Sequence, residues 1–94
     1  MLIDYEEEQV VTSFRYLPPQ STREGTITHY TLWASTDWQN WTKLASGEFS
    51  NIVNNPIWQT VRFNPVHAKM LRLDADGLAE GERMAFSDIE VVTE

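Results

Sequence analysis

The sequence has no cysteine, no apolar run long enough to span a bilayer and few basic residues. Without cysteine, disulfide bonds and thiolate metal sites are excluded. A membrane-spanning helix needs about 20 apolar residues, so membrane insertion is not expected. The 7 basic residues are scattered among 14 acidic ones, and the net charge is −7. Such a surface disfavours nucleic acids and anionic membranes as partners and leaves neutral ligands, such as sugars, open.

The sequence motifs of common enzyme classes are also missing. Neither His29 nor His67 has the spacing of a metal ligand, and no nucleophile elbow or phosphate-binding glycine loop is present. A glycosidase needs two carboxylates at a defined separation in a cleft, for which a chain of 94 residues has little room. We therefore predict that this chain is not an enzyme.

The sequence does contain alternating, aromatic-rich segments between turns. Ile27–Ser35 is the clearest strand, and a turn at Thr36–Asn40 returns it into a hairpin. Turns are also predicted at Glu6–Glu8 and Asn64–Pro65. Short strands at this spacing predict one antiparallel β-sandwich over residues 1–94. The positions expected in its core include Tyr30, Leu32, Trp41, Ile57, Val61 and Phe63.

The other three tryptophans could either pack within the protein or contact a ligand. Trp33 and Trp58 lie on the strand faces opposite the aliphatic side chains, where they either pack in a second layer or contact a ligand. Trp38 sits at the tip of the hairpin turn, where burial is difficult. An exposed indole there can stack on the apolar face of a sugar ring.

Seven stretches resemble, in the same order, the discoidin-like family, also called F5/8 type C domains, whose bacterial branch is carbohydrate-binding module family 32. They are Leu2–Tyr5, Phe14–Pro18, Ile27–Trp41, Ala45–Ile57, Val61–Phe63, Ala68–Leu73 and Ser87–Val91. The sequence of Gly47–Ile57 is most similar to the corresponding segment in modules of bacterial α-L-fucosidases and hexosaminidases. The resemblance implies a jelly-roll sandwich of the galactose-binding-like fold, and a secreted or periplasmic, non-catalytic module that holds a parent enzyme on glycans.

The chain is shorter than the family domain and begins at what would be an internal strand. The first strand, and a loop histidine that contacts sugar in many relatives, are therefore expected to be missing. A sandwich without that strand has an exposed edge. Our hypothesis is that the chain is an N-terminally truncated domain, or that it completes itself as a homodimer.

The sugar-binding loop of the family is altered in this chain. The arginine that contacts galactose in relatives corresponds to Pro19, and the asparagine downstream corresponds to Glu24. Proline offers none of the donors of a guanidinium, so the usual galactose site is expected to be impaired, with Arg23 as a substitute. The candidate contacts for a terminal galactose-type or fucose-type sugar are Gln20, Arg23, Glu24, and Trp38 or Met84 as apolar platforms.

Two further positions follow from the resemblance. Trp38 replaces a turn glycine, so a positive φ there would strain the backbone. Asp88 takes the place of a carboxylate that helps bind a structural calcium ion in relatives, although their other ligands come from N-terminal loops that this sequence lacks. The alternative function, of a different class, is a structural domain that packs against a catalytic or partner domain without binding sugar.

Overall fold

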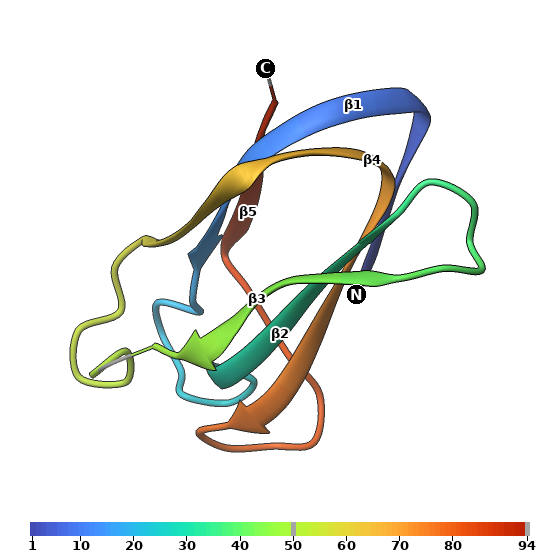
Figure 1. Ribbon diagram of the computed structural model, residues 1–94. Coiled ribbons are helices and arrows are strands. Elements are labelled where there is room, and N and C mark those ends of the chain that lie inside the picture. Colours follow the sequence, from blue (N-terminus) through green and yellow to red (C-terminus); the bar gives the residue numbers. More distant parts are fainter. Residues whose placement is uncertain (50, 94) are drawn as a thin grey trace.

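The computed structural model describes residues 1–49 and 51–93, which form five strands and no helix (Figure 1). The strands are β1 (Leu2–Leu17), β2 (Ile27–Ser35), β3 (Thr42–Glu48), β4 (Gln59–Leu78) and β5 (Asp88–Thr93). They form one sheet in the order β3-β2-β4-β1-β5, and every neighbouring pair is antiparallel. The predicted all-β antiparallel fold is confirmed. Nothing helical in the described residues is long and apolar enough to cross a membrane.

This single sheet folds over itself because its two longest strands are bent. The 20 residues of β4 would extend roughly 66 Å if straight, whereas the longest dimension of the molecule is 36 Å. Val61 and Leu73, near the two ends of β4, pack in the same core cluster. The curvature of β1 and β4 in Figure 1 therefore produces the two layers of the sandwich from one hydrogen-bonded sheet.

The bends coincide with irregularities in the pairing of β1 with β4. Residues 5–8 of β1 lie opposite a single residue of β4, and residues 63–65 of β4 lie opposite a single residue of β1. Extra residues on one strand bend it and increase its twist. The turns predicted at Glu6–Glu8 and Asn64–Pro65 are thus wrong, because both segments lie inside continuous strands.

The core has a large and a small cluster. The large cluster consists of Phe14, Tyr16, Ile27, Leu32, Phe49, Ile52, Val61 and Leu73. The small cluster consists of Val11, Ala34, Ala68 and Leu71. Ile57 is 55% exposed, and the prediction that it lies in the core is wrong because it precedes β4 in a loop. Trp41 is only partly buried.

Trp33 and Trp58 pack on the outer faces of the sheet rather than in the core. The Arg15 guanidinium lies 4.3 Å from the centre of the Trp58 ring and pairs with Glu90 at 2.6 Å. Trp33 lies beside Arg72, whose guanidinium is 5.3 Å from its ring centre. Both indoles are therefore covered by arginine side chains, which favours the packing interpretation over the ligand interpretation.

Candidate functional site

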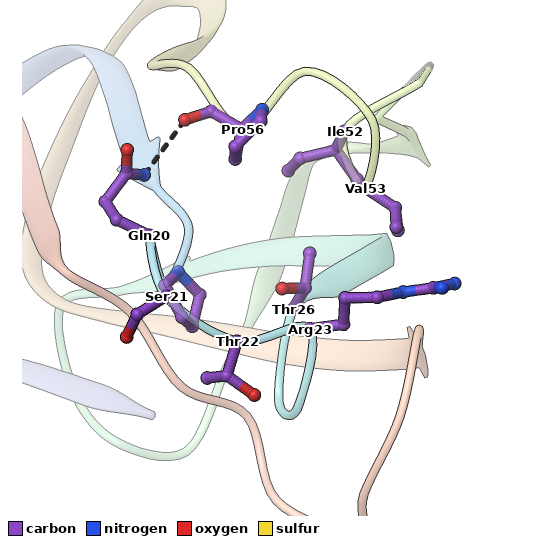
Figure 2. A pocket seen from close by; sticks show the side chains of 9 residues that line it. Gln20, Ser21, Thr22, Arg23, Thr26, Ile52, Val53 and Pro56 are labelled. Atoms are coloured by element: carbon purple, nitrogen blue, oxygen red, sulfur yellow. Dashed lines mark hydrogen bonds between the residues drawn. The ribbon is translucent and has the colours of Figure 1, made fainter.

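A shallow pocket of about 200 Å³ lies between the β1–β2 loop and the loop that follows β3 (Figure 2). The β1–β2 loop carries its polar wall, and the other loop carries its apolar side. It is lined by Pro19, Gln20, Ser21, Thr22, Arg23, Thr26, Ile52, Val53 and Pro56. Two of the predicted site residues, Gln20 and Arg23, are therefore brought together at this pocket.

Gln20 joins the two loops. Its amide nitrogen donates one hydrogen bond to the carbonyl of Pro18 at 2.8 Å and another to the carbonyl of Pro56 at 2.9 Å. The second bond is the dashed line that crosses the pocket in Figure 2. Both amide hydrogens are thus occupied, and the amide oxygen of Gln20 is the group that can accept a bond from a ligand.

Arg23 extends outward past Val53 in Figure 2. Its side chain is 62% exposed, and its Nε atom lies 3.8 Å from a carboxylate oxygen of Glu80. An exposed ion pair of this length contributes little to stability. The guanidinium is therefore available as a fork of donors beside the pocket.

Thr22 also lines the pocket, but its side chain points away from Ile52, Val53 and Pro56 in Figure 2. Its hydroxyl oxygen accepts a hydrogen bond from the backbone N–H of Glu24 at 3.1 Å, so the hydroxyl hydrogen is available to donate. Glu24 itself points to the other side of the loop. There it lines a separate hollow with Gly81, Glu82 and Arg83, so the structure separates Glu24 from Gln20 and Arg23.

Gly25 anchors the β1–β2 loop to the segment before β5. Its N–H donates to the carbonyl of Glu80 at 2.8 Å, and its carbonyl accepts from the N–H of Ala85 at 2.8 Å. Its φ is +80°, and a Cβ atom there would lie 2.6 Å from the Cβ of Ala85. Only glycine fits this left-handed position without displacing the neighbouring backbone.

The structure does not place the two predicted apolar platforms at this pocket. Met84 is partly buried and packs against the large core cluster. Trp38 follows the far end of β2, whereas the pocket adjoins the start of that strand, where Thr26 lines it. Nine residues of β2 separate the two ends, or about 30 Å of strand. The structure therefore places Trp38 away from this pocket, and Met84 is not among the residues that line it.

Asp88 begins β5 and is exposed. Its carboxylate accepts a hydrogen bond from the N–H of Ile89 at 2.8 Å. The described residues contain no group of three or more histidine, cysteine or acidic side chains that could hold a metal ion. Because calcium takes six to eight oxygen ligands, these residues do not fit a calcium ion by themselves.

The apolar side of the pocket, formed by Ile52 and Val53, was not predicted from the sequence. Ile52 is 1% exposed, and Val53 packs against the core. In the sequence, both residues fall within the Ala45–Ile57 stretch that resembles the family. Two adjacent aliphatic residues in the loop that follows β3 were the available signal that it folds back onto the sheet.

Comparison with known proteins agrees with this fold. The sequence profile of the F5/8 type C domain matches residues 2–89. The chain is 71% identical to part of a glycoside hydrolase family 29 member from an unknown rumen bacterium, with a TM-score of 0.97; the match covers 100% of this chain and 17% of that one. No curated protein matches the sequence.

Two further solved structures are more distant. A putative α-L-fucosidase from Bacteroides ovatus is 32% identical, with a TM-score of 0.82; the match covers 99% of this chain and 17% of that one. CpGH89CBM32-5 from Clostridium perfringens, solved with GalNAc-β-1,3-galactose, is 26% identical, with a TM-score of 0.80; the match covers 90% of this chain and 58% of that one. The chain therefore spans only a part of each of these proteins, and it is a non-catalytic module of the F5/8 type C domain family.

Proposed function

We propose that this chain is a carbohydrate-binding accessory module of a bacterial α-L-fucosidase-type glycoside hydrolase, and that its pocket binds a terminal sugar. The pocket between the two loops is the observation that carries the proposal. The relatives support the setting, since two are a family 29 glycoside hydrolase and a putative α-L-fucosidase, and a third was solved with a galactose-containing disaccharide. The same proposal places the protein outside the cytoplasm, where such glycans are displayed.

The chemistry of the pocket suits neutral hydroxyl groups. Arg23 supplies donors, and the amide oxygen of Gln20 supplies an acceptor. Each sugar hydroxyl both donates and accepts, so it can use groups of both kinds. Val53, which is only partly buried, offers an apolar surface to the C–H groups of a pyranose ring. The net charge of −7 makes anionic ligands less suitable.

A binding experiment tests this proposal. The protein is first screened on an array of galactose- and fucose-terminated glycans, and the strongest ligand is then titrated by calorimetry. Arg23→Ala should weaken binding about 10- to 100-fold, because a charge-assisted donor is removed. Arg62→Ala removes an exposed guanidinium that does not line the pocket, and it should leave the affinity unchanged.

Gln20→Glu gives a second, independent test. This change keeps the size of the side chain but removes the amide hydrogens that join the carbonyls of Pro18 and Pro56. We expect weaker binding because the two walls of the pocket lose their link. The proposal fails if the array shows no bound glycan, or if Arg23→Ala and Gln20→Glu bind as tightly as the unchanged protein.

One observation favours the alternative of a domain that packs against a catalytic partner. Ile57, Phe86 and Val92 are 55%, 49% and 43% exposed. Ile57 and Phe86 precede strands β4 and β5, which flank the end of β1, since Tyr16 pairs with both Gln59 and Ile89. If packing is the function, Ile57→Ser with Phe86→Ser should lower the melting temperature of the full-length parent enzyme and not that of this chain alone.

A further inference from the structure

We infer that the turn between β2 and β3 forms a second carbohydrate contact surface, with the indole of Trp38 as its stacking face. This surface is distinct from the pocket described above, because β2 lies between them. It needs no residue of the β1–β2 loop, so it stands whether or not the pocket binds sugar.

The indole of Trp38 is open to solvent and held from one side. Trp38 as a whole is 49% exposed. The Trp38 and Trp41 rings are 6.3 Å apart between centres, with an interplanar angle of 86°. In this edge-to-face arrangement the rings do not stack on each other. Trp41 therefore supports Trp38 and still leaves an indole surface exposed.

The backbone of the turn is fixed by two side chains. The Ser35 hydroxyl accepts hydrogen bonds from the N–H groups of Asp37 at 3.2 Å and Trp38 at 3.1 Å. The Asp37 carboxylate accepts from the N–H groups of Gln39 at 2.9 Å and Asn40 at 2.8 Å. The hydrogen bonds that the Asp37 carboxylate accepts, chiefly those from Asn40, hold the pKa of Asp37 well below its usual value. A turn fixed in this way loses little conformational entropy when it binds a ligand.

Trp41 is in turn held by a stack that crosses the outer face of the sheet. The guanidinium of Arg72 lies 5.1 Å from the Trp41 ring centre and 5.3 Å from that of Trp33. Asp74 fixes this arrangement, since it accepts a hydrogen bond from the Trp33 indole at 3.0 Å. The Asp74 carboxylate also forms an ion pair with Arg72, with 3.2 Å between a carboxylate oxygen and Arg72 Nε. This Nε atom is buried and has no hydrogen-bond partner among the described residues. The aromatic platform is therefore attached to the rigid sheet.

The surroundings of Trp38 favour a sugar over a protein partner. Thr36, Gln39 and Asn40 are all exposed, and their hydroxyl and amide groups can donate and accept hydrogen bonds to sugar hydroxyls. A stable protein interface usually needs at least about 1,000 Å² and an apolar centre. One indole beside these neutral polar groups and the Asp37 carboxylate is the smaller arrangement, and it fits a single pyranose ring.

Nuclear magnetic resonance tests this inference through the indole N–H signals. The Trp38 signal, assigned with Trp38→Phe, is followed during titration with D-galactose, L-fucose and GalNAc-β-1,3-galactose. We expect it to move with at least one of these sugars, both in the unchanged protein and in Arg23→Ala. On a mucin-containing affinity gel, Trp38→Ala should bind about tenfold more weakly, and Trp58→Phe should bind like the unchanged protein.

The outcomes separate this surface from the pocket. Loss of the Trp38 shift in Arg23→Ala would show that the two surfaces are not independent and would overturn the inference. A Trp38 signal that none of the three sugars moves at millimolar concentration would also overturn it. So would a signal that moves only when the catalytic domain is added, since the partner would then be a protein. Failure of the pocket alone leaves the Trp38 shift in place.

Discussion

The hydroxyl group of Tyr16 accepts a hydrogen bond from the backbone N–H of Ile27 at 3.1 Å. The same hydroxyl donates to the carbonyl of Ala85 at 2.7 Å. The ring is fully buried, 5.6 Å from that of Phe49, and burial raises the pKa of Tyr16 above its usual value. One phenol therefore ties the end of β1 to the start of β2 and to the segment before β5, at the base of the β1–β2 loop.

Tyr16→Phe should destabilise the protein by about 1–3 kcal/mol, because the N–H of Ile27 and the carbonyl of Ala85 would lose a buried partner. Urea unfolding followed by tryptophan fluorescence measures this change. Tyr30→Phe is the matched control, since the described residues provide no hydrogen bond for its hydroxyl and its ring stacks on Phe49 at 4.5 Å. Equal stabilities of the two variants would contradict the role assigned to the Tyr16 hydroxyl.

Gly25→Ala should cost more than about 2 kcal/mol, because a left-handed backbone is unfavourable for alanine and its Cβ would lie 2.6 Å from that of Ala85. Gly47→Ala is the control in β3. A Cβ atom there would lie 3.6 Å from its nearest neighbour, the Tyr30 hydroxyl, which is ordinary contact. We expect Gly47→Ala to change the melting temperature little, and a comparable loss in both variants would refute the argument from backbone geometry.

Trp38→Gly should be more stable than Trp38→Ala by about 1 kcal/mol, because Trp38 has a φ of 69° and glycine adopts this conformation without steric cost. Both variants remove the indole and its contact with Trp41, so their difference isolates the backbone term. Thermal unfolding of the two proteins under one condition gives the comparison. If the alanine variant is equally stable, the turn does not hold this residue in a left-handed conformation.

Asp37→Asn should remove part of the acid sensitivity of the protein. The pKa of Asp37 is lowered by hydrogen bonds from Asn40 and Gln39, so its stabilising contribution is present above its usual value of 3.8. That contribution is lost as the pH falls below this value toward the lowered pKa. Unfolding curves at neutral pH and at about pH 2 should therefore differ less for Asp37→Asn than for the unchanged protein. The prediction fails if Asp37→Asn shows the same difference between the two pH values as the unchanged protein.

Several features of the fold could be predicted from local patterns. Alternation along Ile27–Ser35 placed Leu32 in the core, and it is buried. The hairpin around Asp37 was predicted from its turn residues. The replacement of a turn glycine by Trp38 indicated that a positive φ there would strain the backbone, and the structure gives this residue a φ of 69°. These predictions succeed because strand periodicity and turn preference depend on neighbours in the sequence.

The site could be predicted only in part. Gln20 and Arg23 were selected from a loop that proved to line a pocket, but the pocket also needs Ile52 and Val53 from a loop about thirty residues further on. No local pattern shows that these two loops meet. Met84 resembled a loop platform in the sequence, but it packs against the core in the structure.

By itself, the sequence determined the all-β class, the membership of its motifs in one family and the replacement of a turn glycine by Trp38, since these depend on residue type and local order. Only the tertiary structure decided that β1 and β4 bend into both layers, because bulges depend on how two strands pair. It also decided that Trp38 and the pocket lie at opposite ends of β2. The direction of a strand separates residues that composition alone would group into one site.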